Sequence, residues 1–148
     1  MYAIPTLSRQ NDYLSFDRRK LEIAPQDISR ALLNIITNAC YEAHRKKLAE
    51  RGTFSPLLSG STRRVEGYVE IRIRDNGNGI SAAIRDRIFT PFVTTKPTGQ
   101  STGLGLSIGN DSMVHGHGGQ LLFETEEGKY PVFTVRLPEG PQKPQAQL

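Results

Sequence analysis

The 148-residue chain contains one cysteine, no tryptophan and no apolar run long enough to cross a bilayer. A single cysteine, Cys40, cannot form an internal disulfide and is typical of a protein from a reducing compartment. That cysteine and three scattered histidines lack the ligand spacing of a zinc site. The amino-terminal residues show no signal-peptide pattern. We therefore expect a cytoplasmic protein whose sequenced segment makes no contact with a membrane.

The bulk properties favour one folded domain with its own hydrophobic core. We expect an amino-terminal segment over residues 1–19, the folded domain over residues 20–138 and a disordered tail over residues 139–148, because the tail is rich in Pro, Gln and Lys. The net charge of +4 is compatible with an anionic ligand, although most such excesses only keep a protein soluble. We expect no nucleic-acid partner.

Two asparagines stand out in the first predicted helix. After a short strand signal at Leu21 and Ile23, Pro25 suits a first helical turn. Apolar residues then follow at the spacing of one helical face, at Ile28, Leu32, Ile35, Ala39 and Ala43. Asn34 and Asn38 lie one turn apart at the border of this face. They can ligate a hydrated cation or a phosphate, or they can form simple surface or core-edge hydrogen bonds, which is the more common use.

An acidic residue followed by glycines ends the next strand. Residues 50–67 are rich in Gly, Ser and Thr and predict a long exposed loop. From Val69 to Arg74 apolar and charged residues alternate, so Glu70 should face water and Asp75 should face the core. A buried carboxylate requires hydrogen bonds, and Gly77 and Gly79 let a ligand approach closely. The stretch therefore predicts a small-molecule pocket.

The second half of the chain offers a loop and a helix start that suit phosphate. Ser81 is a plausible N-cap of a short helix. The segment 94–102 contains several hydroxyls and one lysine, Lys96, and predicts a flexible loop. The run 103–108 (GLGLSI) predicts a helix start whose free backbone N–H groups suit an anion. Two strands, at 121–123 and 133–137, should form a closing hairpin.

Other ligand motifs match less well. There is no glycine-lysine-Ser/Thr run of the Walker type, and the calcium-loop pattern places Gly77 and Gly79 where ligands belong. Residues 77–82 match the G-x-G-x-x-A form of a dinucleotide site. However, the preceding strand is half charged, and no acidic residue ends a second strand about 20 residues further on.

Four segments taken together are specific. Asn34-Ile-Ile-Thr-Asn38-Ala39, Asp75-Asn-Gly77-Asn-Gly79-Ile80, Phe89-Thr-Pro-Phe92 and Gly103-Leu-Gly105-Leu-Ser-Ile108 follow one another in the order of the N, G1, F and G2 boxes. The chain thus resembles the ATP-binding domain of histidine kinases, a member of the Bergerat fold shared with DNA gyrase, the heat-shock chaperone and mismatch-repair ATPases. The resemblance implies an α+β fold, a two-layer α/β sandwich with a mixed sheet and helices on one face.

The resemblance also implies ATP and Mg²⁺ as cofactors. Asp75 would accept the adenine amino group, Asn38 would bind the metal, and Lys96 would close over the phosphates, with Asn38 and Lys96 as the catalytic residues. The implied nucleotide contacts are Asn34, Asn38, Tyr41, Asp75, Gly77, Gly79, Ile80, Phe92, Thr95, Lys96, Thr102, Gly103, Leu104, Gly105 and Leu106. Tyr41 stands where many kinases carry a lysine, so it is expected to contact the base or ribose instead. No glutamate base stands near Arg30 or Asn34, which disfavours ATP hydrolysis by an activated water.

The implied function is transfer of the ATP γ-phosphoryl group to a histidine on a separate or upstream dimerisation domain, with a response regulator receiver domain downstream. His44, His115 and His117 lack the acidic neighbour expected of the phosphoacceptor, so the chain is expected to be the catalytic half of a two-component sensor kinase. An anti-sigma-type serine kinase of the same fold and a non-catalytic interaction module are the alternatives.

Overall fold

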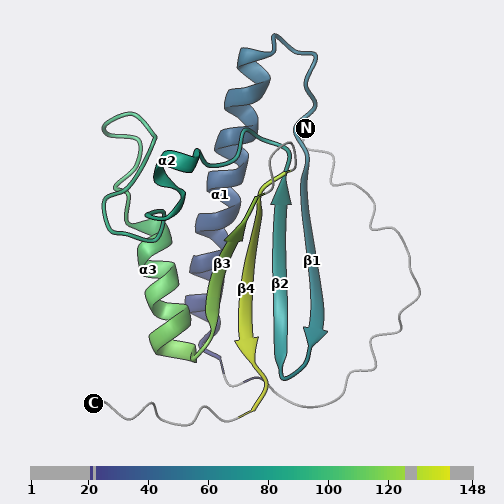
Figure 1. Cartoon of the computed structure of the whole chain (residues 1–148), viewed down its shortest axis with the longest axis vertical. Coiled ribbons are helices and arrows are strands. Elements are labelled where there is room, and N and C mark those ends of the chain that lie inside the picture. The colour runs from purple at the N-terminus through teal and green to yellow at the C-terminus, as the bar shows by residue number, and fades with distance from the viewer. Residues whose placement is uncertain (1–20, 22, 126–129, 141–148) are drawn as a thin grey trace, which may run out of the picture.

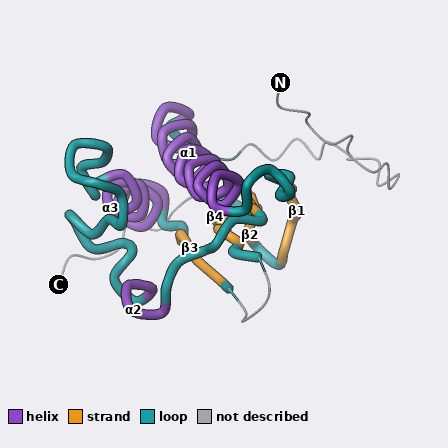
Figure 2. Tube along the Cα trace, turned by 90° about the horizontal axis from the view of Figure 1, so that it is seen from above, coloured by secondary structure: helices purple, strands orange, loops and turns teal. Residues whose placement is uncertain are grey.

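The protein folds into two layers, a four-stranded sheet with its helices on one face (Figure 1, Figure 2). This computed structural model describes residues 21, 23–125 and 130–140. The elements in chain order are α1 (Pro25–Ala49), β1 (Leu58–Val65), β2 (Tyr68–Asp75), α2 (Ala82–Arg85), α3 (Gly105–Asp111), η1 (Ser112–Gly116), β3 (Gln120–Glu124) and β4 (Val132–Pro138). The predicted α+β sandwich is confirmed. The predicted segment 1–19 and most of the predicted tail lie outside the described residues.

Helix α1 is the long helix that the apolar spacing predicts. Its buried residues are Ile28, Ala31, Ile35, Ala39 and Ala43. Three of them, Ile28, Ala31 and Ile35, belong to one core cluster with the sheet residues Ile73, Leu121, Phe133, Val135 and Leu137, together with Ile88 and Met113. This stripe is one face of a 3.6-residue period, and its burial rather than helix propensity holds α1 on the sheet. No helix in the described part of the chain is long and apolar enough to cross a membrane.

The sheet has the strand order β1-β2-β4-β3, and all three neighbouring pairs are antiparallel. A mixed sheet was expected, and the topology explains the difference. The segment from α2 to η1 carries the chain from β2 to β3. These two strands run in the same direction, because each of them is antiparallel to β4. The final strand, β4, inserts between them and runs the opposite way. The two parallel strands consequently never become neighbours.

Strand β1 corrects the prediction of an irregular loop over residues 50–67. Its eight residues pair with β2 from Leu58 opposite Asp75 to Val65 opposite Tyr68. Only these two end residues are partly buried, and the rest of β1 is exposed. An edge strand that buries so little shows no apolar alternation, so its Gly, Ser and Thr residues resemble a loop in sequence. The strand predicted near Leu21 and Ile23 is not formed at those two residues.

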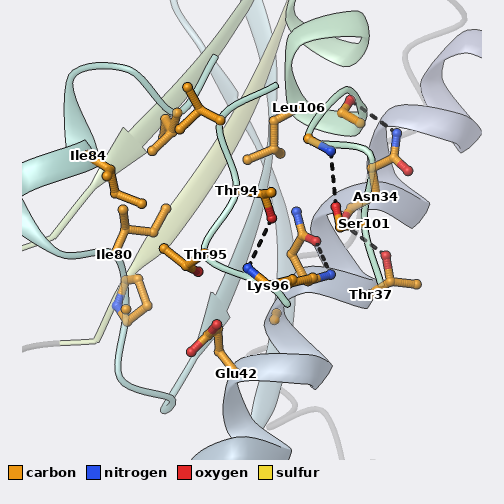
Figure 3. A pocket seen from close by; sticks show the side chains of 18 of the residues that line it. Asn34, Thr37, Glu42, Ile80, Ile84, Thr94, Thr95, Lys96, Ser101 and Leu106 are labelled. Carbon is orange, nitrogen blue, oxygen red and sulfur yellow. Dashed lines mark hydrogen bonds between the residues drawn. The ribbon is translucent and has the colours of Figure 1, made fainter. Parts of the chain in front are cut away.

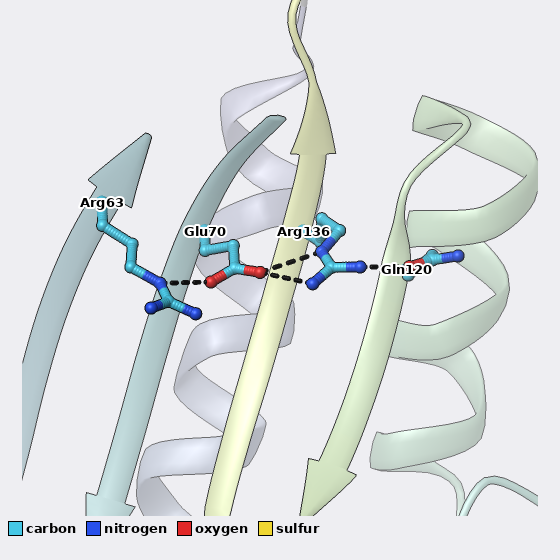
Figure 4. A network of polar contacts seen from close by, with 4 residues as sticks. All are labelled: Arg63, Glu70, Gln120 and Arg136. Atoms are coloured by element: carbon cyan, nitrogen blue, oxygen red, sulfur yellow. Dashed lines mark hydrogen bonds and ion pairs between the residues drawn. The ribbon is translucent and has the colours of Figure 1, made fainter. Parts of the chain in front are cut away.

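Glu70 was expected to face water, and it is 1% exposed instead. It lies on the sheet face away from the helices, between Arg63 on β1 and Arg136 on β4 (Figure 4). Arg63 Nε donates to the carboxylate at 2.6 Å and Arg136 Nε at 3.0 Å, and Arg136 also donates to Gln120 on β3. The hydrogen bonds from Arg136, and to a smaller extent the one from Arg63, lower the pKa of Glu70, although burial acts to raise it. The sheet face away from the helices thus carries a row of hydrogen-bonded polar side chains that crosses all four strands.

The last helical stretch ends as predicted, at His117-Gly118-Gly119. Helix α3 continues into the π-helical turn η1, and His117 is buried at its end. The imidazole Nε2 accepts a hydrogen bond from the backbone N–H of Ala24 at 3.0 Å, so Nδ1 is the donor to the Ser112 carbonyl at 3.0 Å. His117 therefore ties the start of α1 to the end of η1, and it is a structural histidine.

Candidate functional site

A cavity of about 670 Å³ lies between α1, the turn after β2, α2, the segment 93–103 and the start of α3. Figure 3 shows Asn34 and Thr37 on one side of it, Ile80 and Ile84 on the other, and Glu42 at the bottom of the view. Its lining includes most of the predicted nucleotide contacts: Asn34, Asn38, Asp75, Gly79, Ile80, Thr95, Lys96, Thr102, Gly103, Gly105 and Leu106. The fold thus brings together residues from three of the four motifs. The fourth, the F box at residues 89–92, does not line the cavity.

Asp75 ends β2 on the helix-covered face, as the alternation predicts, and is 6% exposed. The Gly77 backbone N–H donates to its Oδ1 atom at 2.8 Å. Burial raises the pKa of this carboxyl. The Gly77 N–H and the Lys46 charge act against the rise, and the Glu42 charge adds to it. Asp75 is therefore a desolvated acceptor at the wall of the cavity, held by a single backbone donor.

The turn after Asp75 has room only for glycine at position 77. A Cβ placed there would lie 2.8 Å from Asp75 Oδ1, 3.1 Å from the Ala43 nitrogen and 3.2 Å from the Glu42 carbonyl carbon. Gly77 thus lies between the carboxylate and the backbone of α1, where there is no space for a side chain. Gly79 has a φ of +71°, a left-handed conformation that side chains rarely adopt. These contacts explain why two glycines follow the acid so closely.

The two asparagines of α1 make different contacts. Asn34 Nδ2 donates to the carbonyl of Gly105 at 3.2 Å, and the missing Gly105 side chain leaves the space that the Asn34 amide fills. Asn34 therefore holds the start of α3 against α1. Asn38 Oδ1 instead accepts a hydrogen bond from Lys96 Nζ at 2.9 Å. The amide oxygen predicted to face a metal thus already faces a cation in the cavity.

The segment 94–104 closes one side of the cavity and is held mainly by its own hydroxyls. Thr94 Oγ1 accepts from the Lys96 N–H at 3.1 Å, Ser101 Oγ accepts from the Gly103 N–H at 3.2 Å, and Thr102 Oγ1 accepts from the Leu104 N–H at 3.4 Å. Two of the backbone amides expected to bind phosphate are therefore satisfied by neighbouring side chains. The N–H groups of the first turn of α3, which begins at Gly105, have no partner within the helix.

Four predicted contacts do not line the cavity. Phe92 is 75% exposed, and its φ of +67° turns the chain so that its backbone packs on Gly103. Its N–H donates to the Gly103 carbonyl at 2.9 Å, so Phe92 joins the two ends of the 94–102 segment. Tyr41 lies behind Lys96, whose ammonium is 4.7 Å from its ring centre. Gly77 lies behind Asp75, and Leu104 is the N-cap residue of α3.

Several lining residues were not predicted. They are Thr37, Ala39, Glu42, Arg45, Asn78, Ser81, Ile84, Ile88, Val93, Thr94, Gly99, Gln100, Ser101, Phe123, Pro131 and Phe133. Glu42 was detectable, because it stands one turn after Asn38 on the same helical stripe. Apart from Ala39 on α1, the apolar members come from α2 and the residues after it, from β3, and from β4 and the residue before it, and only the tertiary fold brings them to the cavity.

A sheet covered on one face by helices, with an acid-glycine turn and a lysine-bearing loop around one cavity, defines a Bergerat-type ATP-binding domain. The chain belongs to the family of histidine kinase-, DNA gyrase B- and HSP90-like ATPases, whose model matches residues 23–141.

Curated relatives and solved structures agree with this family. The sensor histidine kinase ZraS of Escherichia coli (strain K12) is 35% identical over 119 residues, which cover 80% of this chain and 23% of that protein. The two-component sensor PprA of Pseudomonas aeruginosa is 47% identical over 75 residues, which cover 51% of this chain and 8% of that protein. The chain therefore spans less than a quarter of either relative. The catalytic domain of histidine kinase ThkA has a TM-score of 0.61 at 27% identity, covering 77% of this chain and 67% of that one.

Proposed function

We propose that this chain is the ATP-binding catalytic domain of a two-component sensor histidine kinase. It would transfer the γ-phosphoryl group to a histidine on a dimerisation domain that is upstream in the same protein or supplied by a separate one. The observation that carries the proposal is Asp75, a buried carboxylate at the wall of the cavity. The relatives are named as sensor kinases, which supports the reaction. The chain matches only part of their length, so the dimerisation and receiver domains would be supplied by segments outside this chain.

Asp75 would recognise adenine through its exocyclic amino group. A carboxylate only accepts hydrogen bonds, and the amino group of adenine donates them. Guanine has a carbonyl at the same position, so two acceptors would face each other and one desolvated group would be left without a partner. The apolar residues Ile80, Ile84 and Phe133 line the same cavity and suit the faces of a purine. This arrangement favours ATP over GTP.

The phosphates would lie between α1, Lys96 and the start of α3. Lys96 would bind phosphate oxygens, and the free N–H groups of the first turn of α3 would bind the same anion. Asn38 fits the proposed Mg²⁺, because its amide oxygen faces a cation and amide oxygens are suitable ligands. Mg²⁺ would neutralise phosphate charge. The described residues contain no group of three or more His, Cys, Asp and Glu that could hold a metal, so phosphate oxygens and water would supply the further ligands.

Catalysis would consist mainly of positioning and charge neutralisation, as is usual for phosphoryl transfer. Asp75 would fix the base, Asn38 and Lys96 would orient the polyphosphate, and the incoming histidine would be the nucleophile. Of the chain's own histidines, His117 is buried and doubly hydrogen-bonded, so it is unsuited to attack. A response regulator receiver domain would accept the phosphoryl group afterwards.

The first test is a calorimetric titration of the 148-residue chain with a non-hydrolysable ATP analogue and with its GTP counterpart, with and without Mg²⁺. We expect binding of the adenine nucleotide, strengthened by Mg²⁺, and much weaker binding of the guanine nucleotide. Absence of binding would contradict the proposal and favour a non-catalytic interaction module. Binding of NAD in preference to ATP would favour the dinucleotide reading.

The second test distinguishes the two kinase chemistries. We expect that adding a histidine-bearing helical hairpin from a related kinase, with radiolabelled ATP, gives a phosphoprotein that is labile in acid and stable in base. An acid-stable phosphoserine would instead support the anti-sigma-type serine kinase.

A further inference from the structure

One peptide group holds the recognition carboxylate, and two residues outside the cavity lining hold that peptide. The N–H of Gly77 donates to Asp75 Oδ1 at 2.8 Å, and the carbonyl of Asn76 belongs to the same peptide bond. Because a trans peptide is planar, its N–H and C=O point in opposite directions. Whatever fixes the direction of the Asn76 carbonyl therefore also fixes the direction of the donor that Asp75 uses.

Lys46, near the end of α1, binds that carbonyl. Its Nζ atom donates to the oxygen of Asn76 at 3.3 Å and lies 4.6 Å from the centre of the Phe54 ring. The contacts form a chain that runs from the Lys46 ammonium through the peptide to the Asp75 carboxylate. A cation on the carbonyl polarises the peptide and strengthens its N–H as a donor.

Asn76 fixes the same peptide from the other side. It is buried, and its Oδ1 accepts from the Leu57 N–H at 2.7 Å while its Nδ2 donates to the Ser55 carbonyl at 2.9 Å. Its own N–H donates to the Leu57 carbonyl at 3.2 Å. Both ends of the side-chain amide are thus used to fasten the turn to the segment that leads into β1.

We propose that Lys46 and Asn76 are positioning residues for adenine recognition, which hold the Asn76–Gly77 peptide so that its N–H orients the Asp75 carboxylate toward the base. This inference rests on the proposed function, and it adds two residues that do not line the cavity. It also gives the segment before β1 a role, because Ser55 and Leu57 supply the carbonyl and N–H groups that hold Asn76.

The charges around Asp75 make the effect of Lys46 distinguishable from general stability. Glu42 and Lys46, one turn apart on α1, act on Asp75 with opposite sign. From the other side the Asp75 N–H donates to the Pro131 carbonyl at 3.4 Å, and the neighbouring Arg74 lies over the Tyr130 ring. Lys46 is one of the two groups that lower the pKa of Asp75, so removing its charge should let Asp75 take up a proton at a higher pH.

The experiment compares ATP with inosine triphosphate, which differs by carrying a 6-oxo group in place of the amine. Wild-type protein should prefer ATP by at least about tenfold, the effect of one hydrogen bond to a charged group. We expect Lys46→Met to weaken ATP binding by about threefold to tenfold while inosine triphosphate binding changes by less than about twofold. The pH at which ATP affinity falls should also rise. Lys47→Met is the matched control, because it removes the same charge from an exposed neighbouring residue.

Asn76→Ala should lose the preference for ATP in the folded fraction, measured from the binding stoichiometry. If Lys46→Met weakens both nucleotides equally, or matches Lys47→Met in selectivity and pH profile, Lys46 and Asn76 have only a structural role and the inference is wrong. A wild-type protein that binds neither nucleotide would overturn the proposed function itself. A wild type that prefers ATP, combined with an unchanged preference in Lys46→Met, would overturn the inference alone.

Discussion

The two ends of the cavity are built in different ways. At the base end, Asp75, Asn76 and Gly77 are buried and bonded to α1, to the segment before β1 and to the connection before β4. At the phosphate end, residues 94–104 are mostly exposed and are bonded mainly to one another. Among the described residues, two side-chain hydrogen bonds join this segment to α1, one from Lys96 to Asn38 and one from Tyr41 to Gln100. The base end depends on the fold of the whole sheet, whereas the phosphate end can move while the fold stays intact.

This contrast assigns different tasks to the two ends. A site that distinguishes an amine from a carbonyl must hold its acceptor rigidly, because a displaced acceptor bonds poorly to either. A site that admits and releases a charged polyphosphate needs a segment that opens.

Gly77→Ala should have the largest effect. The added Cβ would clash with Asp75 Oδ1 and with the backbone of α1, so we expect a loss of about 1–3 kcal/mol of unfolding free energy and more than about 100-fold weaker ATP binding. Gly99→Ala is the matched change at the phosphate end. Its Cβ meets nothing within 4 Å, and its φ of +88° costs about 1–2 kcal/mol in a segment that can relax. Thermal unfolding and calorimetry measure both. Equal effects of the two variants would contradict the proposed difference in rigidity between the base end and the phosphate end.

Asp75→Asn should weaken ATP binding by about 10–100-fold, because it replaces a hydrogen bond to a charged acceptor by a neutral one. Its effect on stability should have the opposite sign. Burial raises the pKa of Asp75, so the ionised group makes the folded state less stable at neutral pH, and the neutral isostere removes that cost. Calorimetry and thermal unfolding of the same samples provide the measurement. A large loss of melting temperature would mean that the carboxylate is structural rather than a recognition group.

Lys96→Met should affect only the phosphate end. We expect about tenfold weaker binding of ATP and an unchanged affinity for adenosine, since the ammonium would contact phosphate and not the base. The melting temperature should hardly change, because residues 94–104 pack few side chains into the core. The ratio of ATP to adenosine affinity is the measurement. If adenosine binding falls by the same factor, the lysine supports the whole cavity and the two ends are not independent.

The sequence predicts the base end better than the phosphate end. Asp75 and its glycines follow from two local rules, the alternation of a strand and the backbone freedom of glycine, and both hold in the structure. Glu70 follows the same alternation, but it is buried rather than solvated because Arg63 and Arg136 approach it from two other strands. That pairing depends on the strand order, which no local pattern contains.

Residues whose position depends on tertiary contacts were missed for the same reason. Phe92 was expected in the cavity, but its left-handed backbone directs it outward and lets it pack on Gly103. Strand β1 was expected to be a loop, because a solvated edge strand has no apolar pattern. Asn76 appeared only as a neighbour of Asp75, and its function in clamping the turn depends on Ser55 and Leu57, which lie about 20 positions earlier in the chain.

The smallest expected effect is a dependence of nucleotide affinity on mildly acidic pH. Burial raises the pKa of Asp75 above its ordinary value of 3.8, so this carboxylate should begin to protonate at a higher pH than an exposed aspartate. A protonated Asp75 accepts poorly from adenine, so we expect the affinity for ATP to fall on acidification, at a higher pH than an exposed aspartate would require.

The fold should survive this range. The stability contributed by Asp75 is complete below its ordinary pKa and is lost as pH rises through the raised pKa, so acidification does not remove it. Glu70 has the opposite sign. Its lowered pKa contributes stability above its ordinary value of 4.5, and that contribution is lost only as pH falls through the lowered pKa. Affinity should therefore decline before the melting temperature does. Calorimetry and thermal unfolding at matched pH values test the order, and Asp75→Asn should show no decline of affinity from this group. If affinity and melting temperature fall together, acid acts on the fold as a whole, and protonation of Asp75 does not by itself control the affinity.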